Sequence, residues 1–327
     1  MKIETTLSGS FPKLPIESGA PNVRVVRNRM DQGKATEKDL AEATRETTRR
    51  IIALQEAAGI DIPVDGQVAW DDGQTYVARG IQGFEIAGLI RYLDTNTYYR
   101  QPEITGPVTW TRPVTVDDFR SAQSMARRPL KAVLPGPYSL YRFSRDRHYR
   151  DPKEAVRAVG EALAQEAKAL EGAGAQWIHF EEPWLGRAKA DEGPLLAIAL
   201  EPVFRGRTAK TVLHVPFRSP APVFDAIRDL EWDVLGLDLV EGAESWDLIP
   251  RVPAGRTVAL GLIDARNTRL ENAREVAEQV RRARAAKSDL TWQLCPTGSL
   301  EYLPVDRAAM KVARLTEAAR LASGNGG

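Results

Sequence analysis

Residues 211–217 read TVLHVPF, a short apolar run with a single histidine, His214, near its C-terminal end. Seven more runs of this β type are spread along the chain, and helix-length segments separate most of them. Such an alternation is typical of a parallel sheet that is built from βα units. The seven other predicted strands are residues 3–10, 60–66, 130–137, 176–183, 234–240, 257–264 and 290–296.

The segments between these runs carry the signals that begin and end helices. Residues 36–58 open with Thr36, which Asp39 follows three residues later, a variant of the capping box. Residues 152–173 start at Pro152, and proline is favoured in the first turn of a helix. Further helices are predicted at residues 222–230, 273–287 and 306–322.

Eight βα units predict an α/β fold, a single (β/α)8 TIM-barrel domain over residues 1–322, with a disordered tail at 323–327. An open doubly wound sheet is the alternative, but it needs a glycine-rich phosphate loop after its first strand. Residues 9–15 read GSFPKLP there, and the two prolines are unsuited to such a loop. Residues 70–112 break the rhythm with an alternating, proline-punctuated pattern, which predicts a β-hairpin-like insertion after the second strand.

The charge balance and the cysteine content limit the partners of the chain. Its 327 residues contain 45 Lys and Arg against 44 Asp and Glu, a formal net charge of +1. This balance argues against nucleic acid or a membrane surface as the main partner, and no apolar run approaches the ~18 residues of a membrane span. The N-terminal residues lack the pattern of a signal peptide, and the one cysteine, Cys295, cannot form an intramolecular disulfide. We therefore expect a cytoplasmic protein.

Polar and ionisable residues stand where the predicted strands end. In a TIM barrel the C-terminal ends of the strands assemble the active site, so this placement predicts an enzyme. His179 and Glu181 share one face of their strand by the period of two, and Glu182 lies on the other face. In chain order, the strand-end residues are Ser8, Ser10, Asp65, Gln67, Tyr138, Ser139, His179, Glu181, Glu182, His214, Asp238, Glu241, Asp264, Arg266 and Cys295.

Three of these residues have the donor types of a zinc site. His214, Cys295 and either Asp238 or Glu241 belong to three different predicted strands and face one mouth of the barrel. Zn²⁺ accepts N, O and S donors, and three protein ligands with an open fourth position are typical of catalytic zinc. A metal in such a site holds a substrate thiol as the nucleophilic thiolate. The structural alternative is a buried cysteine that packs as a small apolar residue and a strand histidine that bonds to backbone.

Six short motifs follow one another along the chain: SGSFP at 8–12, DG at 65–66, GPYS at 136–139, EEP at 181–183, then His214 and Cys295. In this order they resemble the C-terminal catalytic barrel of cobalamin-independent methionine synthase, and the likeness extends over roughly residues 3–320. The chain looks like the short, single-barrel relatives of that enzyme. The resemblance implies an α/β barrel, a zinc-activated thiol acceptor and methyl transfer to sulfur.

The resemblance also implies roles for single residues. Ser10 matches the serine whose loop holds the amino-acid carboxylate, and Glu181 matches the aspartate that binds the substrate amine. His214 and Cys295 match two zinc ligands, and Asp238 falls where the family has a glutamate ligand. The expected cofactor is therefore Zn²⁺, held by these last three residues.

The sequence departs from the family at three site positions. Pro216 stands where the family's His-x-Cys zinc motif has its cysteine, and a proline side chain has no donor atom. Gln67, in DGQ, replaces the glutamate of the family's HGE, and Arg266 lies near the place of a catalytic histidine. The sequence around Cys295 also differs, since LCPTG replaces NPDCG. These departures concern the metal and the acceptor; the barrel pattern is unaffected.

The expected function is the transfer of a methyl or alkyl group to or from a thiol acceptor similar to homocysteine. Glu181, Asp264 and Arg266 are the expected catalytic residues. The chain has length for one barrel, so the donor would not be a polyglutamyl folate held by a second barrel, and a methylated corrinoid protein could deliver the methyl group. The expected substrate-binding residues are Ser8, Ser10, Asp65, Gln67, Tyr138, His179 and Glu181.

Two other functions stay open at the level of the sequence. A barrel whose metal site has decayed could act as a metal-free lyase or decarboxylase on a carboxylated small molecule. A non-catalytic barrel could bind a small molecule or a partner protein. Calorimetric titration with homocysteine and with acidic metabolites would separate these functions from thiol methylation.

Overall fold

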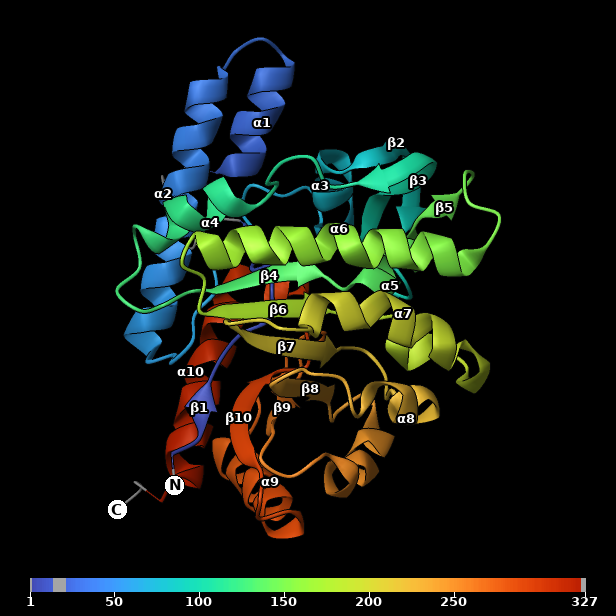
Figure 1. Ribbon diagram of the computed structural model, residues 1–327. Helices are drawn as coiled ribbons and strands as arrows, with labels where there is room; N and C mark the ends of the chain where they lie inside the picture. Colours follow the sequence, from blue (N-terminus) through green and yellow to red (C-terminus); the bar gives the residue numbers. More distant parts are fainter. Residues whose placement is uncertain (1, 14–21, 325–327) are drawn as a thin grey trace.

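A computed structural model describes residues 2–13 and 22–324 of the chain. Its large sheet has seven parallel strands in the order β1-β10-β9-β8-β7-β6-β4, and the sheet curls with helices on its outer side (Figure 1). This is an α/β fold of the TIM-barrel type, as predicted. The strands are β1 (Glu4–Thr5), β4 (Lys131–Pro135), β6 (Trp177–Glu181), β7 (Lys210–Val215), β8 (Val234–Asp238), β9 (Thr257–Ile263) and β10 (Thr291–Pro296).

The strand predicted at residues 60–66 is not regular. Ile62 pairs with Thr6 in an isolated parallel bridge, and the Ile62 amide donates to the Thr5 carbonyl at 3.0 Å. On the other side of this segment, the Lys131 amide donates to the Pro63 carbonyl at 2.9 Å. Residues 60–66 therefore lie between the edge strands β1 and β4, but Pro63 has no N–H to give to a ladder, which limits regular pairing.

The predicted helix starts are confirmed for two long helices. Thr36 and Asp39 exchange hydrogen bonds at the start of α2 (Glu37–Ala58), and Pro152 opens α6 (Pro152–Gly172). The other α-helices are α1 (Val23–Asp31), α3 (Gly73–Gly80), α4 (Val116–Gln123), α5 (Pro137–Phe143), α7 (Gly193–Phe204), α8 (Phe224–Ile227), α9 (Ala273–Ala286) and α10 (Val305–Ala322). The 3₁₀ helices are η1 (Leu185–Arg187), η2 (Ala190–Glu192), η3 (Ala221–Val223), η4 (Ala243–Arg251) and η5 (Leu300–Tyr302).

The helix predicted at residues 222–230 is wrong in its length. A 3₁₀ turn and the single-turn α8 take its place, and α8 ends at Ile227. The buried indole of Trp232 donates to the Ile227 carbonyl at 2.8 Å. This bond satisfies a carbonyl at the end of the helix, so the chain can turn early toward β8.

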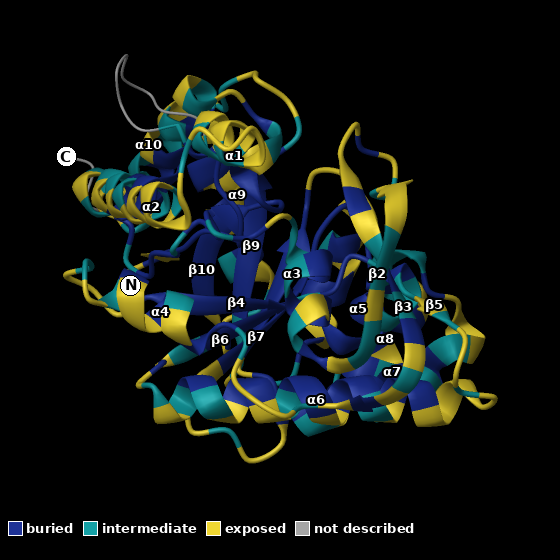
Figure 2. Ribbon diagram, turned by 90° about the horizontal axis from the view of Figure 1, so that it is seen from above, coloured by how far each residue is buried: buried dark blue, intermediate teal, exposed yellow. Residues whose placement is uncertain are grey.

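A second, small sheet lies apart from the curled one. β2 (Gln82–Arg91) and β3 (Tyr98–Thr109) pair antiparallel, and β5 (Arg145–Asp146) pairs in parallel with β3. We call residues 92–97, which connect β2 and β3, the hairpin tip. Figure 2 shows long exposed stretches on β2 and β3, in contrast to the buried strands of the large sheet.

The base of this hairpin is fixed to α6 by a buried carboxylate. Glu166 has no exposed surface and accepts hydrogen bonds from Trp110 Nε1, from the Thr115 amide and from Thr115 Oγ1, each at 2.7 Å. A buried charge is tolerated when several donors surround it. The base of the hairpin is therefore rigid, which fixes where its tip can reach.

Inside the curled sheet, an apolar cluster lies beneath the polar side chains at the C-terminal ends of the strands. Val212, Val234, Ala259 and Cys295 form a buried cluster of their own. By the period of two, Val212 shares a face of β7 with His214, which lies two residues closer to the C-terminal end of that strand. The cluster is thus a floor under the strand ends. None of the helices in residues 2–13 and 22–324 is long and apolar enough to cross a membrane.

Candidate active site

Two histidines and a glutamate meet at the C-terminal ends of β6 and β7. His179 and Glu181 are two residues apart on β6, so both face the interior, and Glu181 is in register with His214 on β7. His179 Nε2 and His214 Nδ1 each lie 3.9 Å from Glu181 Oε1. One ligand atom from each residue lies within 4.8 Å of the other two, a spacing that suits one shared metal ion.

Three of the four histidine ring nitrogens in this group are buried without a hydrogen-bond partner. His179 and His214 are each 1% exposed, and within the described ranges neither ring nitrogen of His179, nor Nε2 of His214, has a hydrogen bond. Burial, with a smaller contribution from the charge of Lys131, lowers the pKa of His179 well below its usual value, so this imidazole is neutral. Neutral imidazole is the form that binds metals, and an unpaired buried nitrogen costs about 1–3 kcal/mol when nothing binds it.

The donor set therefore fits a divalent metal ion. Two imidazoles and one carboxylate from adjacent strands are a recurring arrangement that leaves positions open for substrate. Glu181 supplies the one negative charge, and its side chain is 20% exposed, so this corner of the group is open to a ligand. His179, Glu181 and His214 could hold a metal ion together, and we call these three residues the metal-binding group below.

The predicted ligands Asp238 and Cys295 do not join His214 in a group of this kind within the described residues. Asp238 uses both oxygens for backbone: Oδ2 accepts from the Phe217 amide at 3.0 Å, and Oδ1 from the Val240 and Glu241 amides at 2.9 Å. This carboxylate holds the loops that follow β7 and β8. Sequence spacing cannot distinguish such a loop anchor from a metal ligand.

The thiol of Cys295 belongs to the apolar floor. It is 2% exposed and packs with Val212, Val234 and Ala259. Burial raises the pKa of the thiol to about 12, although Lys131 opposes the shift. The thiol is therefore protonated at neutral pH, and Cys295 is not part of the metal-binding group. The structural alternative considered for Cys295, a small packing residue, describes its surroundings here.

The SGSFP segment after β1 reaches the metal-binding group. Ser8 Oγ lies 3.3 Å from His214 Nδ1, and the Ser10 amide donates to Ser299 Oγ at 3.1 Å. Ser299 Oγ in turn lies 3.4 Å from Glu181 Oε1. A side chain at Gly9 would come within 2.9 Å of Ser299 Oγ and 3.2 Å of Glu181 Oε2, so this glycine allows the close approach.

Gln67 and Ser10 are also brought together. Ser10 Oγ donates to Gln67 Oε1 at 2.5 Å, and Gln67 Nε2 donates to the Val133 carbonyl at 3.3 Å. Four residues of the predicted substrate set, Ser8, Ser10, Gln67 and His179, thus lie around Glu181. All four belong to the strand-end residues that the sequence indicates.

Other predicted site residues make their contacts elsewhere. The Tyr138 hydroxyl donates to Glu192 at 2.6 Å, and Asp65 accepts from the Gln67 amide at 3.0 Å. Asp264 Oδ1 accepts from the Arg266 amide at 2.8 Å, and Arg266 pairs with Glu241 at 2.6 Å. Asp65, Tyr138 and Asp264 therefore support loops, whereas Arg266 lies farther out at the mouth.

Lys131 was not predicted as a site residue. It is 3% exposed, its Nζ donates to Thr6 Oγ1 at 2.8 Å, and burial lowers the pKa of its ammonium group to about 8. The nearby charges that oppose this shift are those of Cys295 and Glu181. Its signal in the sequence is a lysine inside an otherwise apolar run, LKAVLPGP at residues 130–137.

The hairpin tip covers the mouth with Tyr92, which the sequence did not indicate. The Tyr92 ring stacks on Phe143 at 4.9 Å and meets Phe217 edge-on at 6.2 Å. Burial raises the pKa of Tyr92 well above its usual value, and among the nearby charges that of Glu181 raises this pKa most. Gln67, Leu93 and Phe217 are the non-glycine residues with positive φ in the described chain, and all three lie at this mouth. Such backbone strain is concentrated at functional sites.

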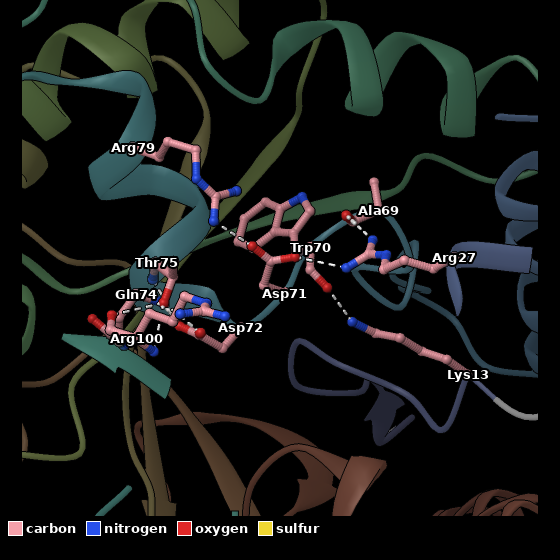
Figure 3. A network of polar contacts seen from close by, with 10 residues as sticks. All are labelled: Lys13, Arg27, Ala69, Trp70, Asp71, Asp72, Gln74, Thr75, Arg79 and Arg100. Carbon is pink, nitrogen blue, oxygen red and sulfur yellow. Dashed lines mark hydrogen bonds and ion pairs between the residues drawn. The ribbon is translucent and has the colours of Figure 1, made fainter. Parts of the chain in front are cut away.

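Beside the mouth is a cavity of about 640 Å³. Phe11 and Glu301, which come soon after Ser10 and Ser299, form part of its wall, and the exposed Tyr98 lines it from the hairpin. Two of its lining residues, Asp71 and Arg27, form an ion pair at 2.7 Å, and Asp71 also pairs with Arg79 of α3 at 2.5 Å (Figure 3). These ion pairs join α1 to α3 and give the cavity a fixed wall.

Comparisons with known proteins show which family and fold the chain resembles. Residues 3–321 match the family described as "Cobalamin-independent synthase, Catalytic domain". The chain is 29% identical over 283 residues to a methionine synthase of Saccharolobus solfataricus, covering 86% of this chain and 82% of that protein. It is 27% identical over 329 residues to a methionine synthase of Sulfurisphaera tokodaii, covering 98% and 92%.

Solved structures show the same fold. A B12-independent methionine synthase from Shewanella sp. W3-18-1, in complex with selenomethionine, superposes with a TM-score of 0.86 at 22% identity and 99% coverage of both chains. A putative vitamin-B12 independent methionine synthase from Listeria monocytogenes gives a TM-score of 0.75 at 15% identity, with both chains fully covered. At these identities the likeness concerns the fold.

Proposed function

The chain belongs to the cobalamin-independent synthase catalytic-domain family, and on that premise we propose that it is a methyltransferase acting on a thiol acceptor similar to homocysteine. The observation that carries the proposal is the metal-binding group: three buried ring nitrogens without hydrogen bonds lie on two imidazoles beside one carboxylate. A family that methylates sulfur needs a way to hold a thiolate at neutral pH, and this group can supply it.

We further propose that the barrel is closed by eight strands within a single domain at residues 1–322. Residues 60–66 would be the eighth strand, since they bond to both edge strands of the sheet. The hairpin of β2 and β3 would be the insertion within residues 70–112. The last three residues of the predicted tail at 323–327 lie outside the described part of the chain.

The residues proposed to hold Zn²⁺ are His179, Glu181 and His214. When bound, the metal lowers the pKa of a thiol that takes its open position, so that the thiol reacts as the thiolate. Pro216 has no donor atom in place of the family's cysteine, and the imidazole of His179 provides a nitrogen donor on the neighbouring strand instead. Glu181 then serves as a ligand, whereas the resemblance implied that it binds the substrate amine.

The polar residues around Glu181 are proposed to hold the amino-acid end of the acceptor. Ser10 and Ser299 offer hydroxyl donors suited to a carboxylate, next to the Ser10 amide. Gln67 would accept from the ammonium group through its amide oxygen, as a neutral replacement for the family's glutamate. The buried ammonium group of Lys131 is near enough to attract the Glu181 carboxylate, and this attraction keeps the carboxylate available to the metal.

The donor is proposed to enter through the cavity beside the mouth. A volume of about 640 Å³ suits a small organic methyl donor or the reactive end of a larger one. We propose a donor other than a polyglutamyl folate held by a second barrel, with a methylated corrinoid on a partner protein as the candidate. A cytoplasmic location is part of the same proposal.

The experiment supplies methylcobalamin and homocysteine to the zinc-loaded protein and measures methionine by mass spectrometry. Methionine that accumulates with the wild type, and at least tenfold less with His179→Gln, supports the proposal. The matched control is His148→Gln, which changes the exposed third histidine of the chain. Failure to methylate homocysteine or other small thiols, in protein that carries zinc, would contradict the proposed acceptor class.

A further inference from the structure

Three arginines from three different loops gather at the mouth, outside the metal-binding group. Arg187 ends η1 after β6, Arg218 follows β7, and Arg266 follows β9. They are close enough to repel one another: burial lowers the pKa of Arg187, and the charges of Arg218 and Arg266 lower it further. Guanidinium groups bind carboxylates and phosphates through charge-assisted, often bidentate hydrogen bonds, so such a cluster suits an anion.

The arginines are only partly neutralised by the protein. Arg187 Nη2 and Arg266 Nη2 each lie 3.5 Å from the carboxylate of Asp94, which is carried on the hairpin tip. Arg187 Nε and Nη2 are buried without a hydrogen bond, and Arg218 has neither a hydrogen bond nor an ion pair with any residue in the described ranges. The arrangement therefore has more donors than Asp94 satisfies.

Asp94 has the features of an exchangeable partner. Its side chain is 49% exposed, and both of its ion pairs are longer than a good charge-assisted hydrogen bond of about 2.7–2.9 Å. It stands beside Leu93, whose φ of +51° is unfavourable for a residue with a branched side chain. The tip is thus held over the mouth by contacts that a better anion can replace.

The space for such an anion is already present. A cavity of about 590 Å³ beside the arginines is lined by Arg218, Phe217 and Ser219 and by the carboxylates of Asp94, Glu241 and the exposed Glu244. Glu241 is paired with Arg266 at 2.6 Å, so its charge is already compensated. Arg187, Arg218 and the Nη2 atom of Arg266 therefore remain for an incoming group once Asp94 moves away.

Aromatic side chains connect this cavity to the metal-binding group. The Arg266 guanidinium lies 5.2 Å over the Phe217 ring, and Phe217 contacts both Tyr92 and Tyr302 edge-on. Glu181 is among the charges that act on both tyrosines. The arginines thus adjoin a set of packed aromatic side chains that lies near Glu181 of the metal-binding group.

We propose that Arg187, Arg218 and Arg266 form a binding site for a carboxylate or phosphate group of a reactant, and that Asp94 occupies this site until the reactant displaces it. The proposal rests on the proposed methyl transfer in one respect: it takes the bound anion to be part of a reactant of that transfer. It defines the class of that reactant, an organic acid or phosphate, and gives the hairpin tip a role in admitting it.

The test is calorimetric titration of the whole protein with inorganic phosphate and, separately, with glutarate. Asp94→Asn removes the internal competitor and should tighten binding of the accepted probe at least about threefold, whereas Arg218→Gln should weaken it at least about fivefold. Arg205→Gln, an exposed arginine at the end of α7 that pairs with Glu201, is the matched control and should leave binding unchanged. Binding of phosphate alone or of glutarate alone identifies the class of reactant.

Two results would overturn the proposal. One is that neither probe binds the wild type or Asp94→Asn; the other is that the probe binds equally well to Arg218→Gln. Hydrogen exchange of residues 92–97 provides a second measurement, since a saturating probe should speed exchange at the hairpin tip, and unchanged exchange would exclude displacement of Asp94. None of these measurements requires turnover, so failure of methyl transfer and failure of this site are distinguishable.

Discussion

A methyl group added at Gly236 should disable the metal-binding group without unfolding the protein. Gly236 on β8 is in register with His214 on β7. A Cβ built on Gly236 would lie 2.4 Å from Cδ2 of the His214 ring and 3.1 Å from its Cγ, and real Cβ contacts are essentially never under 3.0 Å. Both residues lie on central strands, so the imidazole has to yield and turn from its position beside Glu181.

The expected size of the effect follows from these distances. When a contact that positions a metal-binding imidazole is changed, the metal affinity typically falls about 10–100-fold. Overpacking costs about 1–3 kcal/mol of unfolding free energy, and replacement of a glycine returns about 0.5–1 kcal/mol, so a net loss of about 0–2.5 kcal/mol is expected. The variant Gly236→Ala should therefore fold and bind zinc weakly.

The assay is a competition titration of Zn²⁺ against a chromophoric chelator, combined with urea unfolding of the metal-free protein. Gly88→Ala is the matched control, because its Cβ would meet nothing within 4 Å, and it should keep wild-type zinc affinity. A folded Gly236→Ala protein with zinc affinity within twofold of the wild type would refute the reasoning. It would mean that His214 either moves freely or does not bind the metal.

Three further outcomes are expected. The variant Asp238→Asn should keep the zinc content of the wild type but lose about 1–3 kcal/mol of unfolding free energy in urea. The reason is that an amide nitrogen would face backbone N–H groups whose hydrogen bonds the carboxylate now accepts. Loss of zinc without loss of stability would contradict this. The pKa of Lys131 is lowered from 10.5 to about 8 in the folded protein. Between these two pH values Lys131 is therefore protonated in the unfolded chain but neutral in the folded one. The stability of the wild type relative to Lys131→Met should rise between pH 8 and pH 10.5 by up to about 3 kcal/mol. Unfolding curves at pH 7 and pH 10 check the direction, and a flat difference would exclude a lowered pKa for Lys131 in the folded protein. Cys295, with a thiol pKa of about 12 and 2% exposure, should not react with a thiol reagent at pH 8 until urea unfolds the protein; rapid labelling of native protein would place this thiol in reach of solvent.

The order of strands and helices could be predicted from the sequence because each element has a local signal. Short apolar runs, the Thr36–Asp39 box and Pro152 depend on neighbouring residues alone. Residues 60–66 show the limit of such signals: the run looks like a strand, but Pro63 reduces it to a bridge. The length of α8 depends on where the Trp232 indole finds an acceptor, which is a tertiary contact.

The candidate site was predicted in its location and only partly in its composition. Strand parity put His179 and Glu181 on one face, but their closeness to His214 depends on the register between β6 and β7, which the sequence does not reveal. Asp238 and Cys295 have the right chemistry for ligands, yet one is saturated by backbone amides and the other lies in the apolar floor. Tyr92 reaches the mouth through the geometry of a hairpin whose base is fixed by the distant Glu166.

The central claim is that the metal is held by His179, Glu181 and His214, without Cys295. The measurement that tests it most directly is the zinc content, by mass spectrometry, of His179→Gln and Cys295→Ala purified alongside the wild type without chelator or a nickel-binding tag. The account predicts about one zinc per chain in the wild type and in Cys295→Ala, and loss of zinc in His179→Gln. Zinc that is lost with Cys295 and retained without His179 would contradict it, and the thiol would then be the ligand.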